Sequence, residues 1–121
     1  VRGDWVLSDR FSGSTLAYQG HGRGLDLQTI VDLERIATAG IAPDITFWLD
    51  LPLQVSLRRR GSRADDRIEA EGEAFLARVS RGFQRLSVER QWTPVAADQG
   101  ADQVQQVMRR LLKDWLDQAP L

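Results

Sequence analysis

An aspartate and an arginine, Asp9 and Arg10, directly follow a short apolar run and are the first residues in the chain equipped for chemistry. Arginine offers a planar fork of donors that matches phosphate oxygens, and aspartate can hold a hydrated magnesium ion or polarise a nucleophile. Phosphoryl transfer needs little more from a protein than positioning and stabilisation of charge. The same two side chains can also simply neutralise each other at the surface, so the pair alone does not choose between these readings.

The segment STLAYQG comes next and supplies groups that could read a nucleotide. Ser14 and Thr15 carry hydroxyls, Tyr18 a phenol and Gln19 an amide, which suit the polar edge of a base and the face of a sugar. Without further context, a helix start with Ser and Thr as local caps is at least as good an interpretation. The glycine-rich stretch GHGRG lacks the spacing of a dinucleotide-binding fingerprint. We expect it to be a flexible loop in which the chain turns.

A third candidate is the basic run RRRGSRADDRIEAEG, from Arg58 to Gly72. It is open to three interpretations: a solvated helix end, a polybasic nucleic-acid patch, or a mobile lid whose arginines close over a triphosphate. Acids within the run and the lack of interleaved aromatics weaken the nucleic-acid reading. Periodicity does not decide between the others.

The elements that position these groups alternate between strands and helices. Residues 5–8 read as a buried strand that ends at Asp9, and residues 45–50 as a buried strand that ends in Asp50. A third strand at 92–96 contains Pro94, which predicts an edge. Helices are expected at 26–39, 53–60, 73–90 and 101–118, and those at 73–90 and 101–118 carry their apolar residues at helical spacing. Such alternation predicts an α/β fold with a parallel sheet, whose ligand crevice lies at the carboxyl ends of the strands.

Within the first of these helices, Asp26 is the expected N-cap, and Leu27, Ile30, Val31 and Leu33 are expected to face inward. Gly40 should end the helix.

Composition is that of an ordinary globular protein. The 121 residues are 42% apolar and 27% charged, with a net charge of −1, which suits one domain over 1–121 and gives no pull toward nucleic acid or membrane. The absence of cysteine excludes disulfides and is compatible with the cytoplasm, where we expect the protein. The apolar runs are too short to span a bilayer.

Taken together, four stretches resemble bacterial thymidylate kinases over essentially the whole chain: DRFSGSTLAYQGHGRGLD, PDITFWLDLP, RRRGSRADDRIEAEG and AADQG. The resemblance implies a nucleoside-monophosphate-kinase fold of the P-loop class, with a parallel sheet, flanking helices and a lid at 58–72. It also implies transfer of the terminal phosphoryl group of ATP to thymidine monophosphate (dTMP), giving dTDP, with Mg²⁺. A homodimer is implied, with neither nucleic acid nor membrane as partner.

The resemblance also assigns roles on the acceptor side. Arg10 would hold the phosphates, and Asp9 would position the acceptor and the metal, the latter through water. Thr15 matches a position that meets the thymine base, with Ser14 beside it, and Tyr18 matches the residue next to the deoxyribose 2′ carbon. Gln19 matches a further acceptor contact.

On the donor side, the resemblance implies catalytic and ATP-binding roles for lid arginines. Arg63 is the first candidate and Arg59 the second. Ala97, Asp98 and Gln99 match the loop that lines the adenine.

One departure is large, because no G-x-x-x-x-G-K-[ST] phosphate-binding loop occurs in this sequence. We therefore expect the chain to be the carboxy-terminal part of a kinase, with an incomplete sheet, inactive and poorly folded by itself. The alternatives are part of a kinase for another nucleotide or a deoxynucleoside, a non-catalytic binding module, and an RNA-binding protein that uses the arginines of 58–67. Steeply salt-dependent binding would mark the last.

Overall fold

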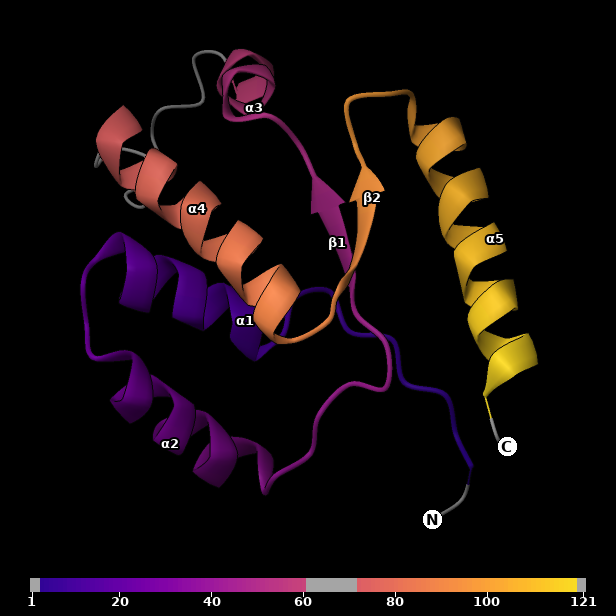
Figure 1. Ribbon diagram of the computed structural model, residues 1–121, viewed down its shortest axis with the longest axis horizontal. Coiled ribbons are helices and arrows are strands. Elements are labelled where there is room, and N and C mark those ends of the chain that lie inside the picture. The colour runs from indigo at the N-terminus through magenta and orange to yellow at the C-terminus, as the bar shows by residue number, and fades with distance from the viewer. Residues whose placement is uncertain (1–2, 61–71, 120–121) are drawn as a thin grey trace. The chain divides into compact units, whose positions relative to one another are not determined.

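The computed structural model describes residues 3–60 and 72–119, which fall into two compact units (Figure 1). One unit comprises 3–42 with 72–86, and the other comprises 43–60 with 87–119. Most of the predicted lid, including Arg63, lies outside the described residues. The expectation of one domain over 1–121 stays a prediction.

The first unit is built from helices. A helical turn, α1 (Ser12–Thr15), continues directly into a π-helical segment, Leu16–Gly22. Two longer helices, α2 (Leu27–Thr38) and α4 (Glu73–Glu89), follow in the sequence. The buried hydrophobic residues of this unit come from the π-helical segment, α2 and α4: Leu16, Ala17, Ile30, Phe75, Leu76, Val79 and Leu86.

Helix α2 begins and ends where the sequence predicts. The Asp26 carboxylate caps it by accepting hydrogen bonds from the backbone N–H of Thr29 at 3.0 Å and from the Thr29 hydroxyl at 2.6 Å. These bonds hold the pKa of Asp26 below its ordinary value of 3.8. Ala39 and Gly40 then take left-handed conformations and end the helix.

The predicted inward face of α2 is only partly right. Ile30 is buried and Val31 half-buried, as expected, but Leu27 and Leu33 are exposed at 41% and 60%. Helix α2 packs against the π-helical segment along a narrow stripe only. This stripe does not cover all four side chains.

The second unit contains a two-stranded parallel sheet. Strand β1 (Phe47–Asp50) pairs with β2 (Thr93–Ala96), with Phe47 opposite Thr93 and Asp50 opposite Ala96. Helix α3 (Leu53–Arg60) follows β1, and α5 (Ala101–Gln118) follows β2 and contacts it. The bounds of α3 and α5 coincide with the prediction, and the α/β class with parallel strands is confirmed.

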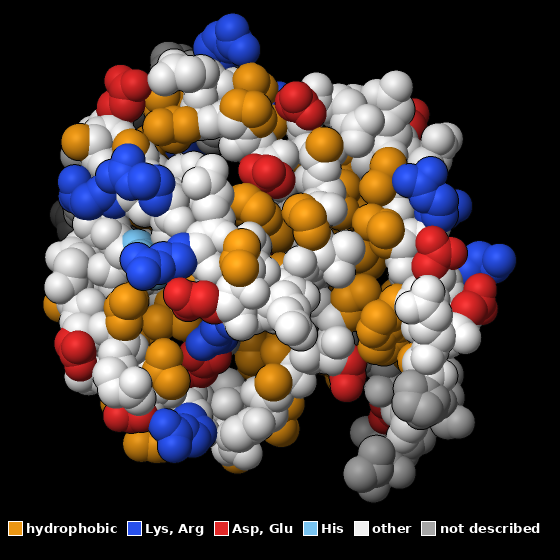
Figure 2. Space-filling view, viewed as in Figure 1, with side chains coloured by type: hydrophobic (Ala, Val, Ile, Leu, Met, Phe, Trp, Pro, Cys, Tyr) orange, Lys and Arg blue, Asp and Glu red, His pale blue; other side chains and the backbone are white. Residues whose placement is uncertain are grey.

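The predicted strand at residues 5–8 is wrong for the described structure. Trp5, Val6 and Leu7 are 73%, 88% and 100% exposed, and the segment is irregular. A strand forms only where a neighbouring strand completes its backbone hydrogen bonds, and the sheet of the described residues consists of β1 and β2. The face drawn in Figure 2 likewise shows hydrophobic side chains open to solvent among interspersed basic and acidic ones.

The glycine-rich stretch is also different from the expected loop. Gly20 and Gly22 are buried inside the π-helical segment, and only Gly24, with φ +80°, lies beyond its end. A Cβ atom at position 22 would lie 2.6 Å from the Phe75 ring and 2.8 Å from Val79. These glycines therefore let helices approach closely rather than making the chain flexible.

Candidate functional site

Asp9 and Arg10 form a turn directly before α1, and the backbone of Arg10 is left-handed, with φ +65°. This conformation costs a residue other than glycine about 1–2 kcal/mol. The other left-handed residues of the described chain besides glycines, Ala39 and Gln91, lie directly after helices, where such a conformation is common. Arg10 instead precedes a helix, and the Ser8 hydroxyl donates a 2.9 Å hydrogen bond to its carbonyl oxygen.

Strain of this kind is found preferentially at functional sites. Because both side chains are exposed, the turn presents a carboxylate and a guanidinium side by side to any ligand.

The four polar residues predicted to read the acceptor lie on the helix that starts at this turn. Thr15 is exposed, while Ser14, Tyr18 and Gln19 are half-buried. The helix widens after Thr15, so that the Arg23 N–H donates to the Tyr18 carbonyl oxygen at 3.0 Å, five residues back. Single π-helical turns of this kind occur frequently at functional sites.

Tyr18 is held by two phenylalanines of α4 that the sequence predicts only as apolar helix positions. Its ring lies 6.2 Å from the Phe75 ring at 53° and 6.0 Å from the Phe83 ring at 82°. The guanidinium groups of Arg23 and Arg78 lie 6.0 and 5.8 Å from the centre of the Phe75 ring. The only sequence signal for the contact of Tyr18 with Phe75 and Phe83 was the helical spacing of the two phenylalanines in the predicted helix at 73–90.

The same two helices meet at a second glycine contact. A Cβ atom at Gly82 of α4 would lie 2.6 Å from the His21 Cβ, and the Arg78 Nε donates to the Gly22 carbonyl oxygen at 2.9 Å. The single histidine is therefore part of the packing between the π-helical segment and α4.

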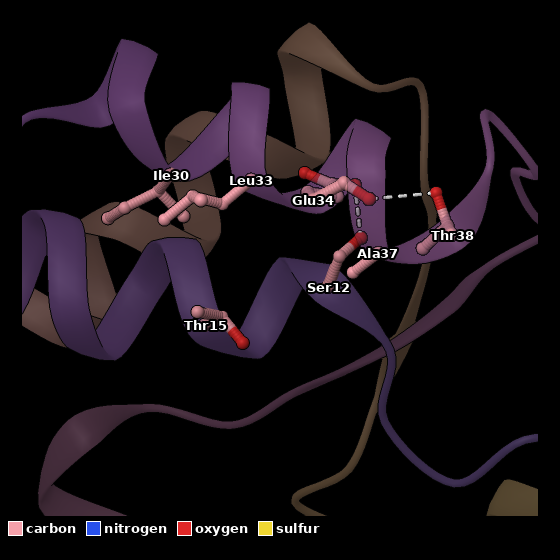
Figure 3. A pocket seen from close by; sticks show the side chains of 7 residues that line it. All are labelled: Ser12, Thr15, Ile30, Leu33, Glu34, Ala37 and Thr38. Atoms are coloured by element: carbon pink, nitrogen blue, oxygen red, sulfur yellow. Dashed lines mark hydrogen bonds between the residues drawn. The ribbon is translucent and has the colours of Figure 1, made fainter.

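A hollow of about 330 Å³ lies between α1 and α2 (Figure 3). Thr15 lies on its wall, and the Ser12 hydroxyl donates a hydrogen bond to the Glu34 carboxylate at one end. The other lining residues are Ile30, Leu33, Ala37 and Thr38. This volume is at the small end of the range for small-molecule sites. This hollow could not be predicted from the sequence, because Ser12 and Glu34 are 22 residues apart.

The described residues that the resemblance predicts for the ATP side lie in the second unit. The Arg59 Nη1 donates to the Ala97 carbonyl oxygen at 3.0 Å, and the Ala97 N–H donates to the Asp50 carbonyl oxygen at 2.8 Å. The Gln99 amide donates to the Ala96 carbonyl oxygen at 2.8 Å, while Asp98 is exposed.

Arg59 and residues 97–99 thus meet at the carboxyl ends of β1 and β2, where ligands bind in open α/β sheets. The structure brings together these predicted residues from segments 38 positions apart.

Within residues 3–60 and 72–119, no three His, Asp or Glu side chains gather as a metal site. A search of the same residues finds no helix with the length and apolar character needed to cross a bilayer.

Comparison with known proteins gives one consistent result. A family model described as thymidylate kinase matches residues 1–108. The chain is 62% identical over 111 residues to a thymidylate kinase of Synechococcus sp. (strain WH7803), an alignment that covers 92% of this chain and 52% of the relative. It is 60% identical over 115 residues to that of Parasynechococcus marenigrum (strain WH8102), covering 95% and 55%. The chain therefore spans about half the length of the curated relatives it matches.

Proposed function

Because the chain belongs to the thymidylate kinase family, we propose that the protein carrying it transfers the terminal phosphoryl group of ATP to dTMP, giving dTDP. The observation that carries the proposal is the strained Asp9-Arg10 turn directly before the helix with the nucleotide-reading side chains. A short segment of chain thereby unites a phosphate-binding guanidinium, a carboxylate and groups suited to a base and a sugar.

On the acceptor side, Arg10 binds phosphate oxygens and stabilises the charge that develops on the transferring group. The left-handed backbone fixes the direction in which its side chain leaves the turn. Ser14 and Thr15 offer hydroxyls to the polar edge of thymine. Tyr18 lies beside the sugar, where its ring excludes a 2′-hydroxyl, and Gln19 adds a further contact.

The residues present fit a magnesium ion held indirectly. Asp9 is exposed, and Mg²⁺ usually keeps several waters while binding one or two carboxylates together with substrate phosphates. When bound, the ion neutralises charge on the phosphates. Asp9 orients its water shell from the protein side.

On the donor side, Ala97, Asp98 and Gln99 line the adenine, and Arg59 lies next to them through its bond to the Ala97 carbonyl. Arg63 and Arg59 are the proposed sources of positive charge over the ATP phosphates. The family also supports a cytoplasmic homodimer that binds neither nucleic acid nor membrane.

The deciding experiment measures phosphoryl transfer by the full-length protein with ATP and dTMP. Arg10→Ala should lower kcat by about 100-fold or more, because the transition state loses a fixed charged donor. Arg10→Lys should recover part of the loss, since it restores the charge without the planar fork. A kcat for Arg10→Ala within a few-fold of the parent would refute the role of Arg10. The 121-residue chain alone should be inactive, because it has no phosphate-binding loop of the form G-x-x-x-x-G-K-[ST].

A further inference from the structure

Phe83 is the residue whose ring meets Tyr18 most nearly at a right angle. The two ring centres are 6.0 Å apart and the planes are at 82°, the edge-to-face arrangement that aromatic pairs favour. Phe83 comes from α4, more than sixty positions further along the chain, and is half-buried.

Phe75 supports Tyr18 from a second direction and is itself packed in the core. It is 1% exposed, Arg23 and Arg78 lie against its ring, and Gly22 leaves no space beside it. The Tyr18 ring is tilted at 53° to this fixed ring. Two rings in different orientations therefore limit the freedom of the Tyr18 side chain.

We propose that Phe83 is a positioning residue that sets the selectivity of the nucleotide site for the sugar. It touches no substrate. It holds the edge of Tyr18 in place, so that a 2′-hydroxyl collides with a fixed ring rather than displacing a mobile one. Phe83 is half-buried whereas Phe75 is fully buried, so Phe83 can be changed without opening the core. The effect of Phe83 on sugar selectivity rests on the proposed function. The packing of Phe83 against Tyr18 is independent of that function.

The packing can be tested by NMR in the full-length protein with ring-labelled tyrosine, where the Tyr18 signals are those that Tyr18→Phe removes. In the parent these signals should be displaced from random-coil positions by the currents of the two phenylalanine rings. Phe83→Leu should move these signals back toward random-coil values.

Phe11→Leu removes a ring two helical turns away from Tyr18 and should leave them in place. Random-coil signals in the parent, or signals indifferent to Phe83→Leu, would overturn the proposal. Phe83→Met, which keeps apolar volume without a ring, replaces Phe83→Leu if that variant does not fold.

The consequence is tested in the full-length protein with dTMP and its ribonucleotide counterpart as acceptors. Phe83→Leu should raise kcat/KM for the ribonucleotide relative to dTMP by about 3–10-fold, in the same direction as Tyr18→Ala but by less. Phe83→Tyr keeps the ring and should restore discrimination. Equal discrimination in parent and Phe83→Leu would refute the positioning role. A parent protein that phosphorylates neither acceptor would refute the proposed function instead, and the NMR result would still stand.

Discussion

The contact between Gly82 and His21 should decide how tightly α4 packs on the π-helical segment. A Cβ atom at position 82 would lie 2.6 Å from the His21 Cβ and 2.7 Å from its Cγ. Since a Cβ atom cannot swing away by side-chain rotation, Gly82→Ala requires the two helices to move apart.

Two opposing terms set the size of the effect. Replacing a glycine inside a helix with alanine gains about 1 kcal/mol of helix propensity, and overpacking a tight contact costs about 1–3 kcal/mol. With two atoms below normal contact distance we expect the upper part of that cost, so that Gly82→Ala lowers the free energy of unfolding by about 1–2 kcal/mol.

The effect of Gly82→Ala on the free energy of unfolding should change sign when the His21 side chain is removed. In a His21→Gly background both contacting atoms are absent, so only the propensity term remains, and Gly82→Ala should raise the free energy of unfolding by about 1 kcal/mol. His21→Ala is the matched control, because it keeps the Cβ and should relieve only part of the clash.

Urea unfolding of the full-length protein followed by far-UV circular dichroism measures these differences. With a slope of about 1–3 kcal/mol per molar urea, each step moves the midpoint by about 0.3–2 M. If Gly82→Ala has the same effect in both backgrounds, to within about 0.5 kcal/mol, the two positions are not in contact and the reasoning is refuted.

Two further outcomes are expected. Because hydrogen bonds from Thr29 lower the pKa of Asp26 below 3.8, the cap should stabilise α2 fully above that pH and lose its effect as the pH falls through the lowered pKa. Asp26→Asn keeps a hydrogen-bond acceptor but does not titrate, so the unfolding midpoint of this variant should fall less at acid pH than that of the parent. The same pH dependence in both proteins would contradict the role of the cap. In the full-length protein, Arg59→Met should raise the KM for ATP by about 3–10-fold, because a hydrogen bond worth about 0.5–1.5 kcal/mol to the Ala97 carbonyl is lost while the apolar stem remains. The KM for dTMP should stay constant. A rise in the KM for dTMP alone would contradict the assignment of Arg59 to the ATP site.

Local rules account for the parts of the fold that sequence reasoning predicted correctly. The Asp26 cap acts over three residues, and the apolar spacing of α5 repeats within that helix. Such signals are complete within a short window of chain, which is why the bounds of these helices could be read from the residues alone. The family was likewise evident from the order and spacing of the four motifs.

The errors fall where the outcome depends on a distant partner. An apolar run such as residues 5–8 becomes a strand only if another strand pairs with it, and the run itself carries no information about whether one does. The stretch GHGRG contains glycines that suit either a flexible loop or a close helix contact. At Gly22 the close helix contact is the observed outcome, because Phe75 and Val79 pack directly against it.

The sequence by itself determined the α/β class, the bounds of α2 to α5, and the residue types of the predicted nucleotide site. Only the tertiary structure decided how those residues are held. It set Arg10 in a left-handed turn, placed Tyr18 against two rings of α4, and joined Arg59 to Ala97 across 38 residues. Residue type is a property of each position, whereas side-chain orientation is fixed by neighbours that are close in space and remote along the chain.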